Sequence, residues 1–304
     1  MELWVWLAVA AAGLQTTRNA LARSIAPNIS PALNSWSRFA FNLPFSTTLA
    51  GTLIVLHGPP RLPLAFFGFC AATALAQLLG NVALVTAFRR GRFGESIVLH
   101  KLEVVFTAAI GVWLFGEDPS PAGWLGVALC ALGVLGMNLA REGGPAGWRR
   151  AFHLDAAAAL SLACALLLVA ASFMLKEANA LFVASNPERP GGFFGAAAQT
   201  LFHTTWIEVA LLSLWIAGRE PGSFRKVPEH WKRMWAIGAT GFLGSLGWFW
   251  AYSLTLVAYV KAVGQIEAVL AVALALHLWK EKTLLRQLPG VALVVIGIGL
   301  VLLG

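Results

Sequence analysis

Residues 103–136 read EVVFTAAIGVWLFGEDPSPAGWLGVALCALGVLG, and residues 267–300 read EAVLAVALALHLWKEKTLLRQLPGVALVVIGIGL. The two stretches align without a gap at a constant offset of 164 positions. The aligned pairs include Glu103 with Glu267, Glu117 with Glu281, Gly126 with Gly290 and Gly133 with Gly297. An apolar composition alone would match several Ala, Val and Leu residues, but it would not readily align two glutamates at one spacing. The alignment therefore predicts an internal repeat.

The composition around this repeat is that of a membrane protein. Of the 304 residues, 58% are hydrophobic and 12% are charged, whereas soluble domains carry about 25% charged residues. A membrane-spanning helix needs roughly 20 mostly apolar residues. Ten segments meet this requirement: 3–22, 33–56, 63–88, 95–115, 121–140, 154–180, 194–217, 234–257, 260–279 and 285–303. The sequence thus predicts an all-α integral membrane protein of ten transmembrane helices.

The repeat divides these ten helices into two halves of five, residues 1–146 and 147–304, within one integral membrane domain. Because five is odd, the second half should enter the membrane inverted relative to the first. Inverted repeats around a site at the bilayer midplane recur in secondary transporters. We therefore expect two inverted five-helix repeats around a central cavity. An old duplication without a role in transport is the alternative.

The formal net charge of +8 comes mostly from loops. Lys and Arg gather in the loops that follow the first, third, fifth, seventh and ninth predicted helices. The positive-inside rule then places these loops in the cytoplasm and both termini outside. We expect the lipid bilayer as a partner, no nucleic acid, and a location in the cell membrane, with the bacterial inner membrane favoured. A homodimer is compatible with the sequence.

The sequence lacks motifs for catalysis or cofactor binding. Cys70, Cys130 and Cys164 lie inside apolar runs and form no metal-binding spacing. Neither HExxH, GxSxG nor a Walker loop occurs. We therefore expect no metal, no cofactor and no enzymatic activity, and we expect any energy coupling to use an ion or solute gradient.

Two segments carry a recognisable pattern. The first contains Leu102-Glu103-Val104-Val105-Phe106 and Leu114-Phe115-Gly116-Glu117, and the second contains Ile266-Glu267-Ala268-Val269 and Trp279-Lys280-Glu281. They resemble the drug/metabolite transporter superfamily, specifically its EamA-type, ten-helix members. That family pattern runs roughly Leu-Glu-Pro-Val-Phe, Leu-Gly-Glu and then a glycine-spaced helix. This chain departs from it at Val104, Ala268 and Lys280.

The resemblance implies ten helices around a central cavity and the transport of metabolites such as amino acids, nucleotide derivatives, sugars or drugs. It also implies that both termini lie in the cytoplasm, whereas the Lys and Arg count places them outside. Both orientations are therefore retained at this stage.

Ionisable residues inside predicted spans are the main candidates for the site. A charge at the bilayer centre costs about 2.5–3.5 kcal/mol on insertion scales, so such residues usually face a wet cavity or a partner. Glu103 and Glu267 lie at matching depths and could bind a cationic group or take up a proton. The alternative is a structural pair with Lys, Arg or a backbone donor. His100 shares a helix face with Glu103 and could relay protons, or could simply lie at the interface.

Uncharged residues complete the candidate cavity. Gln77 and Asn81 are four residues apart and lie on one helix face, where they could line a cavity or bond a neighbouring helix. Trp248 and Tyr252 share the same spacing and could hold a planar or cationic solute, or belong to the interfacial aromatic belt. Gln265, next to Glu267, is included with the cavity candidates.

The remaining repeated residues have structural interpretations. Glu117 and Glu281 fall at helix ends and should cap or pair to fix a turn. The glycines at positions 126, 133, 290 and 297 lie on small-residue faces, which are typical of close helix packing.

The leading functional hypothesis is a secondary transporter, with export favoured, of a small metabolite or drug-like solute. The alternatives are a lipid-linked flippase, a membrane enzyme that acts on lipid through His100, Glu103 or Glu267, and a membrane scaffold that transports nothing.

Overall fold

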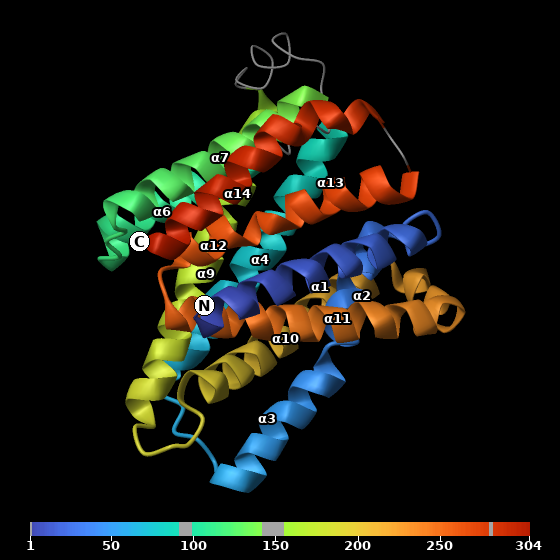
Figure 1. The fold of residues 1–304 in the computed structure, drawn as a ribbon. Coiled ribbons are helices and arrows are strands. Elements are labelled where there is room, and N and C mark those ends of the chain that lie inside the picture. Colours follow the sequence, from blue (N-terminus) through green and yellow to red (C-terminus); the bar gives the residue numbers. More distant parts are fainter. Residues whose placement is uncertain (1, 91–98, 142–154, 280–281) are drawn as a thin grey trace. The chain divides into compact units, whose positions relative to one another are not determined.

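A computed structural model describes residues 2–90, 99–141, 155–279 and 282–304, and every regular element in these ranges is helical (Figure 1). The α-helices are α1 (Leu3–Ile25), α2 (Pro31–Ala40), α3 (Leu43–His57), α4 (Leu64–Arg90), α6 (Glu103–Phe115), α7 (Pro121–Arg141), α9 (Ala156–Ser185), α10 (Gly192–Arg219), α11 (Val227–Leu254), α12 (Val257–Gly264), α13 (Ile266–Trp279) and α14 (Leu288–Leu303). Two 3-10 helices, η1 (Pro221–Lys226) and η2 (Lys282–Gln287), precede α11 and α14. Each of the ten predicted segments contains helix within the described residues, so the all-α prediction is confirmed there.

Six helical segments of the described chain are long and apolar enough to cross a membrane. They are Pro31–His57, Leu64–Ala87, Pro121–Asn138, Ala156–Ser185, Gly192–Arg219 and Leu285–Leu303. These segments make the chain a multi-pass membrane protein.

One predicted span, 33–56, is divided into α2 and α3 by a proline. Pro44 has no backbone N–H with which to bond the carbonyl of Ala40, so the helical ladder is interrupted there. The amide of Phe41 bonds the carbonyl of Ser37, and that of Asn42 bonds the carbonyl of Phe39. Helix α3 then restarts at Leu43, and Asn42 before it keeps helical backbone angles, with φ −75° and ψ −35°.

A second span, 260–279, is divided into α12 and α13 at Gln265. The Gln265 backbone N–H bonds the Ala262 carbonyl, three residues back, instead of the Lys261 carbonyl. The Gln265 side-chain amide bonds the Lys261 carbonyl instead, at 3.1 Å. This compensation is what allows a helix to break inside an apolar segment.

The chain divides into two compact units. Unit 1 contains Met1–Leu75 and Met174–Leu254, and unit 2 contains Ala76–Phe173 and Thr255–Gly304. Each unit therefore takes segments from both halves of the proposed duplication. The two units are described separately below.

In unit 1, α1 packs along a row of glycines on α11. Gly241, Gly244 and Gly247 recur every third residue, and they face Arg18, Leu14 and Ala11 of α1 in turn. The absence of side chains lets the two backbones approach closely. Buried aromatic and aliphatic clusters around Phe66, Leu175 and Met234 complete this unit.

In unit 2, α7 and α14 cross at four glycines. A methyl group built on Gly126 would lie 2.6 Å from the Gly297 carbonyl oxygen, and one on Gly133 would lie 2.6 Å from that of Gly290. Such distances leave no room for any side chain, so only glycine allows this approach. Between the two contacts, the Cys130 thiol lies 3.6 Å from the Val294 carbonyl oxygen.

Candidate functional site

An ion pair lies at the centre of the candidate site in unit 2. Lys261 Nζ lies 3.3 Å from Glu103 Oε2, and the two side chains are 6% and 14% exposed. The Lys261 ammonium also donates to the Leu168 carbonyl, at 3.4 Å. Screening by water is weak at such low exposure, so each charge depends strongly on the other.

Two further titratable residues join this pair. His100 interacts electrostatically with Glu103, with Lys261 and with Glu267. The His100 ring also contacts a thiol, with 3.5 Å between Nδ1 and the Cys164 Sγ. Glu103, Lys261, His100 and Glu267 are called the charged cluster below. The structure thus brings together three of the residues predicted from the sequence.

Helix ends position the acidic members of the charged cluster. Glu103 is the first residue of α6, and Glu267 is the second residue of α13. The positive end of the helix dipole lies at the N-terminus and favours a carboxylate there. Both helices start inside segments that the sequence predicts as single spans, so both carboxylates are held at interruptions of a helix.

Lys261 was not among the residues singled out as candidates for the site. A signal for it is present in the sequence, because Lys261 is flanked by apolar residues over 257–264 and no other charge lies within five positions. Its partner is 158 residues away, however, and a single sequence without the fold does not identify such a pair.

Gln265 takes a structural position next to the charged cluster. It is 4% exposed and its amide bonds the Lys261 carbonyl, so it fixes the backbone that carries Lys261. Gln77 and Asn81 are half-buried on α4, in the same unit. Neither side chain forms a hydrogen bond with the described part of the chain.

The aromatic candidates lie in the other unit. The Trp248 and Tyr252 rings stack, with centroids 6.1 Å apart and planes at 21°. Trp248 Nε1 donates to Gln15 Oε1 at 3.2 Å, which holds the indole against α1. The structure therefore groups Trp248 and Tyr252 with α1 and unit 1.

Glu117 is buried and binds a helix that is distant in sequence. Its Oε2 accepts a hydrogen bond of 2.9 Å from the Val257 amide, at the first residue of α12. The next helix in the chain, α7, is instead capped by Ser120, whose hydroxyl accepts from the Gly123 amide. Glu281, the repeat counterpart of Glu117, lies outside the described residues.

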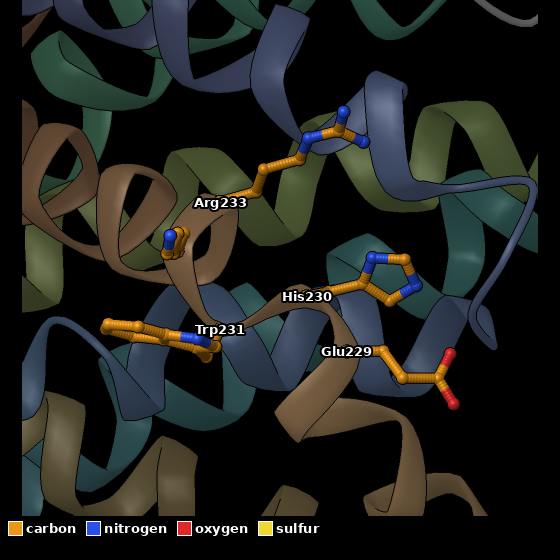
Figure 2. A pocket seen from close by; sticks show the side chains of 5 residues that line it. Glu229, His230, Trp231 and Arg233 are labelled. Carbon is orange, nitrogen blue, oxygen red and sulfur yellow. The ribbon is translucent and has the colours of Figure 1, made fainter.

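A hollow of about 500 Å³ lies at the start of α11 and contains none of the predicted site residues. It is lined by five consecutive residues, 229–233. Figure 2 shows the Glu229 and His230 side chains extending to one side and the Trp231 side chain extending to the opposite side. The Lys232 ammonium lies 5.8 Å from the Trp231 ring centroid. Basic and aromatic residues at a helix end are typical of a membrane–water interface.

Comparisons with known proteins agree with the resemblance seen in the sequence. Residues 2–139 match the EamA-like transporter family. A search of curated proteins gave no match. Solved structures gave 27 matching chains. One of them, titled "Crystal structure of protein", has a TM-score of 0.72 at 17% sequence identity. The match covers 98% of this chain and 95% of the other, and at that identity it shows a shared fold alone.

Proposed function

We propose that this chain, whose residues 2–139 match the EamA-like transporter family, is a secondary transporter that moves a small metabolite or drug-like solute by alternating access. The match of residues 2–139 to this family model and the six apolar segments of spanning length support a membrane transporter of the drug/metabolite superfamily. The mechanism and the coupling are the proposal.

The charged cluster is the observation that carries the proposal. A helix that needed only to pack would place apolar residues at positions 103, 261 and 267. Removing one partner of a buried ion pair costs about 3–5 kcal/mol, because the other charge is left uncompensated. Opening the Lys261–Glu103 pair therefore requires a replacement, either a proton on the carboxylate or a charged group of a solute. Such a requirement couples binding to a change of conformation.

The pattern of contacts at the α7–α14 crossing supports the inverted repeat. At the offset of 164, Gly126 corresponds to Gly290, and Gly133 corresponds to Gly297. The observed contacts are Gly126 with Gly297 and Gly133 with Gly290. This exchange is what a two-fold axis between antiparallel equivalent helices produces. Two halves related in this way can exchange roles between the two membrane faces.

Solute flux across proteoliposomes containing the full chain tests the proposal. A thermal-shift screen in detergent first selects a solute that raises the melting temperature, and counterflow of that radiolabelled solute is then measured. We expect Glu267→Gln to reduce flux at least about tenfold, equivalent to about 1.4 kcal/mol, with folding intact. Glu229→Gln is the matched control, because Glu229 is exposed near a helix end and outside the charged cluster.

Full flux in the Glu103→Gln, Glu267→Gln double variant would overturn the coupling role. Chemical change of the solute during the assay would instead favour an enzyme. Movement of a labelled lipid without solute flux would favour a flippase.

A further inference from the structure

A second set of buried polar groups lies in unit 1, on α10. Thr200, Thr204 and Glu208 follow one another at intervals of four residues, so they lie on successive turns of one helix face, and Thr205 adjoins Glu208 at an interval of three. Their exposed fractions are 0%, 1%, 2% and 0%, respectively. These four residues are called the polar row. None of them belongs to the charged cluster.

Four atoms of the polar row lack a hydrogen-bond partner within the described ranges of the chain. They are Thr200 Oγ1, Thr204 Oγ1, Thr205 Oγ1 and Glu208 Oε1. A threonine in a helix commonly satisfies its hydroxyl on the carbonyl four residues back, as Thr73 does on the Phe69 carbonyl at 2.9 Å. Buried polar groups are almost always paired, and ordered water is the usual partner where protein supplies none.

Charged residues from neighbouring helices border the polar row. Glu208 interacts electrostatically with Arg38 of α2, and Thr204 lies against the Cys70 thiol of α4. The side chains of Arg38 and Arg18 both approach Gly241 of α11, at 3.7 and 3.6 Å from a methyl group built there. Arg38 thus brings a positive charge to the Glu208 end of the polar row.

We propose that the polar row binds a file of internal water molecules that solvates the Glu208–Arg38 pair inside unit 1. Water fits these groups because a hydroxyl both donates and accepts, and because Glu208 Oε1 needs a donor. The Arg38 guanidinium, which interacts electrostatically with Glu208, disfavours a metal cation beside that carboxylate. The near-zero exposure of all four residues disfavours an organic solute. Water molecules are small enough for an enclosed site, and they are therefore the occupant that we propose.

Isosteric substitution distinguishes a hydrated row from a dry one. Valine has the shape of threonine without the hydroxyl. If water binds, Thr200→Val, Thr205→Val removes its partners, and we expect the melting temperature to fall by about 2–4 °C. If the row is dry, the same double variant removes two unpaired buried hydroxyls and the melting temperature rises, which would overturn the proposal. Thr73→Val is the matched control, since Thr73 is equally buried but internally bonded.

Two measurements on the unmodified protein remain decisive if the variant does not fold. Water-edited solid-state NMR in bilayers should show fast magnetisation transfer from water to Thr200 and Thr205 and slow transfer to Thr73. Equally slow transfer to all three would overturn the proposal. Melting temperatures in sodium chloride and in choline chloride should agree, whereas a rise in sodium that disappears in the double variant would identify a bound cation instead of water. None of these readouts depends on solute transport.

Discussion

At the scale of single residues, the Lys261–Glu103 pair illustrates how a membrane protein tolerates charge. Each ion alone would be strongly unfavourable in an apolar helix, and the pair persists because the partners satisfy one another and Lys261 also reaches a backbone carbonyl. A pair of this kind is costly to break but contributes little net stability compared with apolar residues. The pair therefore suits the binding role proposed above better than a role in folding.

This asymmetry predicts different effects for single and double variants. Lys261→Ala should lower the free energy of unfolding by about 3–5 kcal/mol, because it leaves the Glu103 carboxylate unpaired. The double variant Lys261→Met, Glu103→Leu should return to within about 1 kcal/mol of the unmodified protein while abolishing flux. Denaturant unfolding and counterflow measure the two quantities. A double variant that transports normally would contradict the role assigned to the pair.

The exposed pair Lys226–Glu229, with 3.1 Å between its charged atoms, provides the comparison. Because water screens both of its charges, Lys226→Ala should change the free energy of unfolding by less than about 1 kcal/mol.

Glu117 allows a second prediction at this scale. Its carboxylate accepts from the first amide of α12, so Glu117→Ala should destabilise the protein by about 0.5–2 kcal/mol, the range for loss of a helix cap. Glu117→Gln retains an oxygen acceptor and should lose less. Equal losses in the two variants, measured by thermal unfolding, would show that the carboxylate contributes through its charge and not through this hydrogen bond.

At the scale of helices, local pattern predicted the existence of the ten segments but not their interruptions. Apolar length is a local property, so each segment is visible in the sequence. The division at Pro44 follows from a missing N–H, but prolines also occur within continuous transmembrane helices. The division at Gln265 depends on a side-chain amide that replaces a backbone bond. The pairing of Lys261 with Glu103 required two helices distant in sequence to meet, and only the fold specifies that meeting.

At the α7–α14 crossing, we expect two glycine-to-alanine substitutions on α7 to change the stability of the protein in opposite directions. Gly126→Ala forces a methyl group against the Gly297 carbonyl and should cost about 1–3 kcal/mol. Gly136→Ala, where a methyl group would meet nothing within 4 Å, should stabilise α7 by about 0.5–1 kcal/mol through helix propensity. Thermal unfolding of both variants checks the signs. Destabilisation by Gly136→Ala would show that the open face at that position has another function.

The symmetry of the crossing extends this prediction. Gly290→Ala should match Gly126→Ala, because the contacts of the two glycines correspond at the repeat offset. Gly126 faces Val301, and Gly290 faces Met137. Met137 and Val301 are themselves separated by the repeat offset of 164.

At the scale of the whole molecule, the two compact units and the two proposed repeats divide the chain differently. The units reflect packing, and each takes segments from both halves of the chain. The repeats are a hypothesis about descent and topology, for which the offset of 164 is the evidence in the sequence. Only the orientation of each half in a membrane can decide between an inverted and a parallel duplication.

Arg61 and Arg225 decide this point, because they are separated by the repeat offset and both are exposed in connections between helices. Arg61 follows the second predicted span and Arg225 follows the seventh, so an odd number of crossings separates them. Single cysteines at the two positions should therefore react with a membrane-impermeant maleimide from opposite sides of sealed vesicles. The natural cysteines, Cys70, Cys130 and Cys164, are buried, so the unmodified chain should remain unlabelled and serves as the control. Labelling of both positions from one side would eliminate the inverted repeat. If the sides differ, the side of Arg225 also chooses between the two orientations, because the positive-inside rule places its basic connection in the cytoplasm.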